Sequence, residues 1–304
     1  MTETTTAPGA HMRAELDSQP ETWARAAAMR DEQRRLPAAG ERVAVVGCGT
    51  SWFMAQSYAA LRESAEAGGE TDAFAASEAF VGRGYDAIVA LTRSGTTTEV
   101  LELVERVRSA GADRPRLIGV IGDPASPLVD LVDDALLLPF ADERSVVQTR
   151  FATTALALFR ASLGESLDDA VADARAALDD VDPSLSDAEQ YSFLGRGWTV
   201  GLAHEAALKM RESSQTWTES YPAMEYRHGP IAIAAPGRIT WQFGTAPDGL
   251  AGQVEATGAR FVQHPIDPLA DLARLHRVAL DRALARGLDP DQPRNLTRSV
   301  ILEP

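Results

Sequence analysis

Short apolar runs and helical spacings alternate along the first half of the chain. Four short, mainly apolar runs are typical of buried strands: residues 42–46, 87–91, 117–121 and 135–139. Apolar residues spaced three or four apart predict helices around them: residues 11–35, 54–61 and 97–110. Strands that alternate with helices at this spacing predict a parallel sheet with right-handed crossovers.

The same order begins again after a helical, Ala/Asp-rich stretch at 151–182. A predicted strand at 191–194 runs into Gly195-Arg196-Gly197 and a helix that includes residues 204–212, and strands are expected at 239–243 and 260–262. The openings VAVVGCGTSWFMAQ and YSFLGRGWTVGLAH share a strand, G-x-G and a helix with small apolar residues, so we expect two copies of one α/β fold. The expected limits are a leader and N-terminal helix at 1–35, a first domain at 36–165, a helical linker at 166–190 and a second domain at 191–304.

Composition limits the classes of function. The 304 residues are 45% hydrophobic and 24% charged, which predicts a globular protein. No apolar run reaches the ~18 residues of a membrane helix, and the polar N-terminus does not resemble a signal peptide. A single cysteine, Cys48, fits a reducing compartment, so we expect a cytoplasmic protein. The net charge of −15 argues against nucleic acid and anionic membranes as partners, and an anionic ligand then needs local donors.

Two hydroxyl-rich loops follow predicted strands. GCGTS at 47–51 suits close approach of a ligand to the backbone and to a helix N-terminus, but alone it is also an ordinary turn. A dinucleotide fingerprint fails because Trp52 replaces its third glycine. TRSGTTT at 92–98 has more hydroxyls than helix capping needs, which favours a phosphate site. Both loops are expected at the carboxyl edge of one sheet.

Three charged residues share one face of a predicted helix. Glu205, Lys209 and Glu212 lie at i, i+4 and i+7, and the alternative to a functional role is an exposed salt-bridge face. Lys209 is the only lysine, the other 28 of the 29 basic residues being arginine. Leu208 stands where the zinc motif H-E-x-x-H needs histidine, so no metal site is expected here. His228 precedes a Gly-Pro turn and is either structural or a proton shuttle.

Six stretches of the chain, taken together, resemble the sugar isomerase (SIS) family, which includes the isomerase part of glucosamine-6-phosphate synthase. These stretches are GCGTS, TRSGTT, FLGRG, ALKMRES, EYRHGP and DQPRNLTRSV. The resemblance implies two SIS domains, each a parallel-sheet, nucleotide-fold-like αβα sandwich, in a homodimer with shared active sites. It assigns the sugar phosphate to residues in two loops: Gly49, Thr50, Ser51, Thr92, Arg93, Ser94 and Thr97. It assigns the sugar itself to three further residues: Gln148, Glu205 and Arg298.

The resemblance also implies catalytic roles. Glu212 would move a proton between C1 and C2, Lys209 would contact the open-chain sugar, and His228 of the neighbouring subunit would handle ring opening. This chain departs from the synthase at positions where Thr92 replaces serine, Arg93 replaces glutamine, Gln148 replaces serine and Arg298 replaces lysine. No glutaminase domain is recognised in these 304 residues.

Without a glutaminase domain, we expect the reaction to run toward ammonia release. The expected function is isomerisation and deamination of a hexosamine 6-phosphate to a ketose 6-phosphate and ammonia, with no metal or organic cofactor. A fructosamine-6-phosphate deglycase and a simple aldose–ketose phosphosugar isomerase are alternatives. A non-catalytic sugar-phosphate sensor belongs to another class, and the presence of both Glu212 and His228 counts against it.

Overall fold

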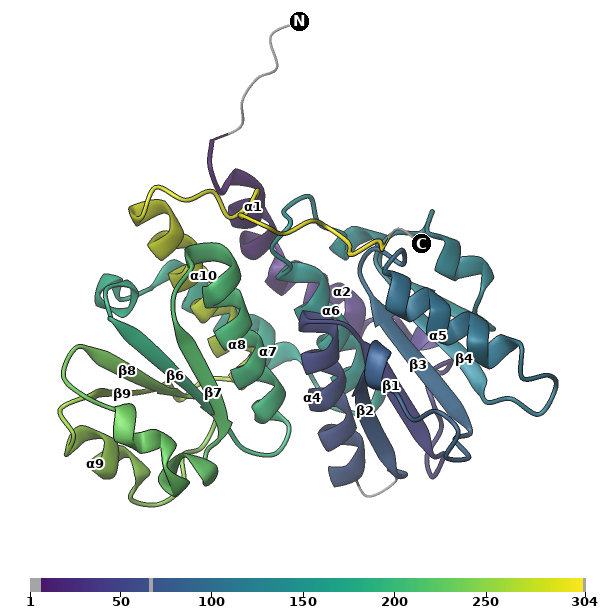
Figure 1. The fold of residues 1–304 in the computed structure, drawn as a ribbon, viewed down its shortest axis with the longest axis horizontal. Coiled ribbons are helices and arrows are strands. Elements are labelled where there is room, and N and C mark those ends of the chain that lie inside the picture. The colour runs from purple at the N-terminus through teal and green to yellow at the C-terminus, as the bar shows by residue number, and fades with distance from the viewer. Residues whose placement is uncertain (1–6, 66–67, 303–304) are drawn as a thin grey trace, which may run out of the picture.

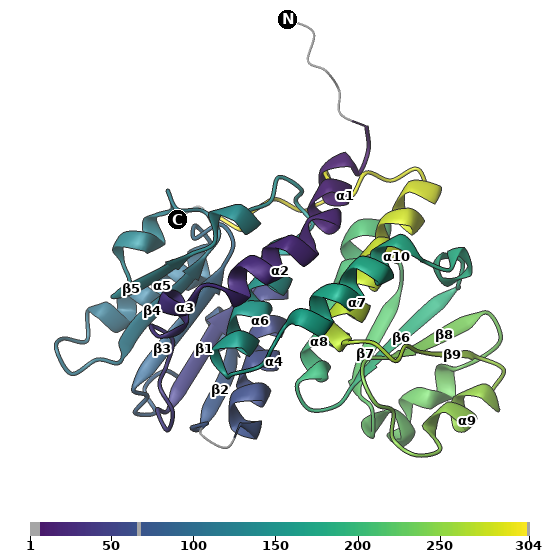
Figure 2. The same ribbon diagram turned by 180° about the vertical axis from the view of Figure 1, so that it is seen from behind.

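The computed structural model describes residues 7–65 and 68–302, in which helices and strands alternate (Figures 1 and 2). The helices are α1 Ala10–Asp17, α2 Gln19–Ala27, α3 Arg30–Gln33, α4 Thr50–Ser64, α5 Thr98–Arg108, α6 Arg150–Ser162, α7 Asp168–Asp179, α8 Thr199–Ser214, α9 Leu250–Glu255 and α10 Pro268–Ala285. The strands are β1 Val43–Gly47, β2 Thr71–Ala75, β3 Ala87–Thr92, β4 Arg116–Ile121, β5 Asp134–Leu137, β6 Gln190–Gly195, β7 Thr218–Pro222, β8 Arg238–Gln242 and β9 Arg260–Gln263.

Two parallel sheets confirm the predicted α/β class with two sheet-containing halves. The first sheet has the order β2-β1-β3-β4-β5 and the second has the order β7-β6-β8-β9. In each sheet the first strand lies inside, with the next strand on one side and the third on the other. The chain therefore reverses its direction of winding between β1 and β3, and again between β6 and β8. The domain limits at residues 35, 165 and 190 stay predictions, and residues 1–6 of the expected leader lie outside the described part.

One hydrophobic core joins the two halves. Alternate residues of β1, such as Val43 and Val45, face this core, whereas Ala44 and Val46 face a smaller cluster beneath α5. Phe193 of the second sheet belongs to the same large core as Val43. Helices α2, α4, α6, α7, α8 and α10 fill the space between the sheets (Figure 1). This arrangement places α4 of the first half directly against α8 of the second.

The sequence-based elements differ from the structure in three ways, the first of which is that helices α9 and α10 were not predicted. The helix expected at 11–35 is divided into α1, α2 and α3, and the stretch at 151–182 is divided into α6 and α7, with Gly164 between them at a φ of +90°. Strands β2 and β7 were not predicted, because they lie at sheet edges where partly exposed TDAFA and TESYP show no continuous apolar run. Within residues 7–65 and 68–302, no helix is long and apolar enough to cross a membrane.

Candidate functional site

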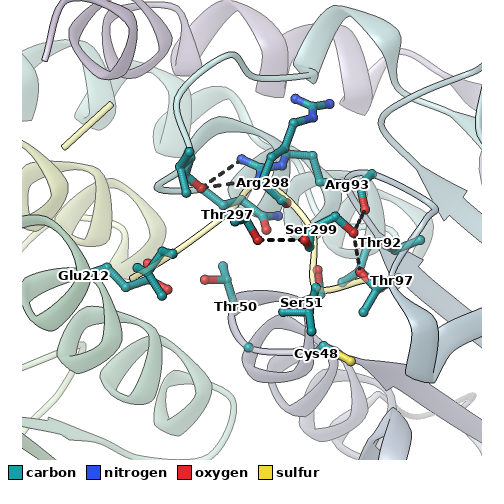
Figure 3. Close-up of a pocket in the computed structure, with 17 residues that line it drawn as sticks. Cys48, Thr50, Ser51, Thr92, Arg93, Thr97, Glu212, Thr297, Arg298 and Ser299 are labelled. Atoms are coloured by element: carbon teal, nitrogen blue, oxygen red, sulfur yellow. Dashed lines mark hydrogen bonds between the residues drawn. The ribbon is translucent and has the colours of Figure 1, made fainter. Parts of the chain in front are cut away.

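A cavity of about 180 Å³ lies at the carboxyl ends of β1 and β3, where the chain reverses its winding (Figure 3). Open α/β sheets bind ligands in this position because loops from the two strands leave toward opposite faces. The cavity is lined by ten of the residues predicted from the sequence: Gly49, Thr50, Ser51, Thr92, Arg93, Ser94, Thr97, Gln148, Glu212 and Arg298.

The loop after β1 leads directly into α4. Gly49 has a φ of +54°, a conformation that glycine adopts readily, and Thr50 and Ser51 follow it as the first helical residues. The positive end of the α4 dipole therefore faces the cavity. Cys48 also lines the cavity, but burial and the Glu99 carboxylate raise its pKa to about 11. Its thiol is thus neutral near pH 7 and is a poor nucleophile.

The loop after β3 concentrates hydroxyl groups. The Thr92 hydroxyl accepts a hydrogen bond from the Gly95 amide at 3.1 Å, which fixes the turn. Thr97 occupies the N-cap position of α5, yet its side chain makes no capping hydrogen bond. Capping therefore does not account for the Thr97 hydroxyl, which points into the cavity (Figure 3).

Ser299, which sequence reasoning missed, lies at the centre of these hydroxyls. The hydroxyls of Ser94 and Thr96 donate to its Oγ at 3.2 and 2.9 Å, and the Thr97 hydroxyl is 3.4 Å away. The backbone around Ser299 is attached to Thr98, whose amide donates to the Val300 carbonyl at 3.1 Å. The C-terminal segment thus covers the second hydroxyl loop. In the sequence, only its place next to Arg298 in the string DQPRNLTRSV pointed to Ser299.

The two arginines of the cavity wall bind the protein itself. Arg93 is 5% exposed, and its guanidinium donates to the Ser145 carbonyl at 2.9 Å and to the Arg298 carbonyl at 2.8 Å. Burial lowers the pKa of Arg93 below its ordinary value. The Arg298 guanidinium donates to an Asp142 carboxylate oxygen at 2.6 Å and to the Glu143 carbonyl. Both guanidinium groups therefore hold the C-terminal segment in place. The resemblance had assigned Arg93 to the sugar phosphate and Arg298 to the sugar.

The charged face of α8 is buried against α4 and is not the exposed salt-bridge face considered from the sequence. Glu205 and Lys209 are 0% exposed, and the Lys209 ammonium donates to Glu212 Oε2 at 2.8 Å and lies 3.7 Å from Glu205 Oε1. Burial acts to lower the pKa of Lys209, but the two carboxylates outweigh it and raise the pKa above its usual value. Only Glu212 of the three reaches the cavity.

Glu205 and Lys209 are connected to the hydroxyl loop through Thr50. The Thr50 hydroxyl donates to Glu205 Oε2 at 3.3 Å and accepts from the Lys209 ammonium at 3.4 Å. Gln148 also lines the cavity, and its buried Nε2 has no hydrogen-bond partner within the described residues. Its amide is therefore a donor that a ligand oxygen can satisfy.

His228 lies apart from the cavity of its own chain. It ends a short turn at Glu225–His228 that follows β7, and its side chain is exposed. It is absent from the residues that line the cavity. The expected contribution of His228 to a neighbouring subunit stays a prediction. Among residues 7–65 and 68–302, no group of three His, Cys, Asp or Glu side chains is placed to hold a metal ion.

Known proteins resemble this chain in sequence and in fold. No family model matches the chain. Glutamine–fructose-6-phosphate aminotransferase from Nostoc sp. (strain PCC 9229) is 30% identical over 86% of this chain and 52% of its own, and the Aeropyrum pernix enzyme is 31% identical over 72% and 44%. The chain spans about half the length of the curated relatives it matches.

Solved structures show the same two-sheet fold. Glucosamine-6-phosphate deaminase from Thermotoga maritima has a TM-score of 0.81 and 24% identity, with 95% of this chain and 99% of that chain covered. Tagatose-6-phosphate ketose/aldose isomerase from Escherichia coli has a TM-score of 0.78 and 18% identity, with 98% and 99% covered. The chain is therefore homologous over 86% of its length to part of glutamine–fructose-6-phosphate aminotransferase, and its two-sheet fold is that of the sugar isomerase (SIS) phosphosugar isomerases.

Proposed function

We propose that this chain isomerises and deaminates a hexosamine 6-phosphate, giving a ketose 6-phosphate and ammonia. The observation that carries the proposal is one cavity with convergent hydroxyls at one side and the Glu212 carboxylate at another (Figure 3). A phosphorylated sugar combines an anionic group with a carbon that must lose a proton, so it matches both features.

The hydroxyl cluster supports binding of the phosphate. Ser94 and Thr96 already direct their hydroxyl hydrogens at a single oxygen, that of Ser299. Phosphate oxygens accept the same hydrogen bonds more strongly because they are charged. The N-termini of α4 and α5 add a favourable dipole. Neutral donors and dipoles can therefore bind an anion although the chain carries a net charge of −15.

The pairing of Glu212 with Lys209 supports the role of base. The Lys209 ammonium donates to Glu212 Oε2 at 2.8 Å, which orients this carboxylate where it lines the cavity, and a positioned carboxylate can accept a proton from carbon. Glu212 removes the proton from C2 of the open-chain amino aldose and returns a proton to C1. The product is a ketimine at C2, and addition of water releases ammonia and leaves the ketose carbonyl. One water is consumed for each ammonia released.

A fructosamine-6-phosphate deglycase is the second candidate, favoured by a neighbouring pocket. This pocket of about 560 Å³ shares Glu212 and Leu296 with the first cavity and is also lined by Arg211, Trp217 and Arg294. Such a space accommodates a substituent on the sugar nitrogen. In that reaction the proton moves from C1 to C2, and water adds to the resulting C1 imine, which releases the amine and leaves an aldose 6-phosphate.

An ammonia-release screen distinguishes these functions. Purified protein is incubated separately with glucosamine 6-phosphate, galactosamine 6-phosphate and N-substituted fructosamine 6-phosphates, and ammonia, amine and sugar products are measured. Ammonia and a ketose 6-phosphate from one of the first two substrates support the deaminase. Release of the amine from a fructosamine 6-phosphate alone contradicts the deaminase and supports the deglycase.

A further inference from the structure

A buried histidine that none of the assigned functions uses contacts the charged face of α8. His276 lies on α10, is 0% exposed, and has its Nε2 3.0 Å from Glu205 Oε1. Glu205 is equally buried and connects His276 to Lys209. A row of four side chains therefore runs from α10 through α8 to the cavity: His276, Glu205, Lys209 and Glu212.

The surroundings of His276 define its tautomer. An ionised carboxylate only accepts hydrogen bonds, so the hydrogen between the two side chains belongs to Nε2 of His276. The other ring nitrogen, Nδ1, is buried and has no partner within the described residues. A charged imidazolium would bury a second N–H without an acceptor, which is costly. The geometry therefore favours a neutral imidazole that donates from Nε2.

This donation changes how Lys209 distributes its hydrogen bonds. Both oxygens of Glu205 have a donor, since His276 faces Oε1 and the Thr50 hydroxyl donates to Oε2 at 3.3 Å. The Lys209 ammonium lies 3.7 Å from Glu205 Oε1 but only 2.8 Å from Glu212. Without the imidazole, Glu205 Oε1 would be free to draw the ammonium away from Glu212.

We propose that His276 is a positioning residue whose neutral Nε2–H satisfies Glu205 and thereby holds the Lys209 ammonium against Glu212. Its effect on catalysis rests on the proposed function, in which Glu212 is the base. Its effect on the position of Lys209 does not.

Replacement of His276 tests the catalytic part. His276→Leu removes the donor at similar volume and is expected to lower kcat by about 10-fold or more, while KM for the sugar phosphate changes by less than about 3-fold. His276→Gln keeps an N–H donor at this reach and is expected to recover most of kcat. A folded His276→Leu protein with wild-type kcat overturns the proposal, as does a His276→Gln protein no better than His276→Leu.

A second histidine–carboxylate pair provides a matched control. His264 Nδ1 lies 2.7 Å from the buried Asp271, which is also on α10, and neither residue lines the cavity. His264→Leu is expected to leave kcat within about 2-fold of wild type. An equal loss of kcat in both leucine variants assigns the effect to general loss of structure and overturns the positioning role.

The single lysine allows a test that needs no turnover. Protein labelled with 13C,15N-lysine gives one ammonium signal, that of Lys209, because the chain contains no other lysine. His276→Leu is expected to shift this signal, and His264→Leu to leave it unchanged. In 15N-histidine spectra, the signal of His276 is identified among those of the five histidines because it is missing in His276→Gln. We expect this signal to be that of a neutral imidazole with its hydrogen on Nε2. An imidazolium, an Nδ1–H tautomer, or an unmoved lysine signal overturns the proposal even if no substrate is found.

Discussion

The guanidinium of Arg93 donates a 2.8 Å hydrogen bond to the main-chain carbonyl of Arg298, which is 205 positions later in the sequence. The same guanidinium binds the Ser145 carbonyl at 2.9 Å. Three segments that surround the cavity are thus joined by one buried side chain: the loop after β3, the loop before α6 and the C-terminal segment (Figure 3). Ser299 reaches the hydroxyl cluster because the residue before it is fixed in this way.

Arg93→Gln is expected to release the C-terminal segment, since a glutamine amide cannot reach both carbonyls. Amide hydrogen exchange of residues 298–302 should become at least about 10-fold faster, and KM for the sugar phosphate should rise. Hydrogen exchange followed by mass spectrometry measures the first effect. The pair of Arg114 and Asp133, which lies away from the C-terminal segment, supplies a control, because Arg114→Gln should leave this exchange unchanged. Unchanged exchange in Arg93→Gln would show that other contacts suffice.

The hydroxyl loop is expected to determine affinity for the phosphate. Ser94→Ala combined with Thr97→Ala removes two donors, each worth about 1 kcal/mol or more to a charged oxygen, so KM should rise at least about 30-fold. Ser109→Ala alters a hydroxyl at the other end of α5, which donates to the Arg106 carbonyl, and should have no effect on KM. Wild-type affinity in the folded double variant would place the phosphate elsewhere.

The pH dependence of stability should report on Glu15. Burial and the nearby Glu143 carboxylate raise the pKa of Glu15 from 4.5 to about 7. Because the folded pKa exceeds the unfolded one, the protonated form stabilises the fold below about pH 4.5, and this contribution is lost as the pH rises through 7. Glu15→Gln should therefore be more stable than wild type at pH 8, by on the order of 2 kcal/mol, and nearly equal at pH 4.5.

Urea unfolding at several pH values measures this difference in free energy. Glu21→Gln is the matched control on the neighbouring helix, because Glu21 is exposed and paired with Arg175. Its stability relative to wild type should change by less than about 1 kcal/mol between the two pH values, because an exposed ion pair contributes little. A constant difference between Glu15→Gln and wild type from pH 4.5 to 8 would contradict the raised pKa.

Lys209 is expected to form no imine with the substrate. Its ammonium is buried between two carboxylates that raise its pKa, so the neutral amine needed for attack on a carbonyl is scarce. Borohydride treatment with a ketose 6-phosphate, followed by intact-mass measurement and peptide mapping, should give no adduct at position 209. A stable sugar-phosphate adduct mapped to Lys209 would establish covalent catalysis instead.

The sequence predicted the parts of the fold that depend on local periodicity. Central strands such as β1 and β3 are buried on both faces and read as continuous apolar runs, and parallel pairing then brings their loops to one edge. Ser51 and Ser94 were consequently expected at one edge of the sheet, whereas only the resemblance to the sugar isomerase family assigned Glu212 to the same site. Edge strands with polar faces carry no such signal, which is why β2 and β7 were missed.

Contacts between distant segments were not predictable from local pattern. Ser299 lies in a segment without helical or strand periodicity, and its position depends on Arg93 and Thr98. The direction of the Arg93 and Arg298 side chains likewise depends on which carbonyls the folded chain brings within reach. The spacing of Glu205, Lys209 and Glu212 showed that they share a face, but only the packing of α8 on α4 showed that the face is buried.

The role of Glu212 as the base is tested most directly by following the C2 proton of the substrate. Glucosamine 6-phosphate deuterated at C2 is incubated with wild type and with Glu212→Gln, which is nearly isosteric, and NMR follows C2 deuterium, ketose 6-phosphate and ammonia. Wild type should release one ammonia for each C2 deuterium lost, and Glu212→Gln should slow this at least about 100-fold while binding is retained. Glu102→Gln, at an exposed position on α5, should react at the wild-type rate. Loss of C2 deuterium at the wild-type rate in Glu212→Gln would contradict the role of Glu212 as the base. No loss in wild type would contradict proton removal from C2.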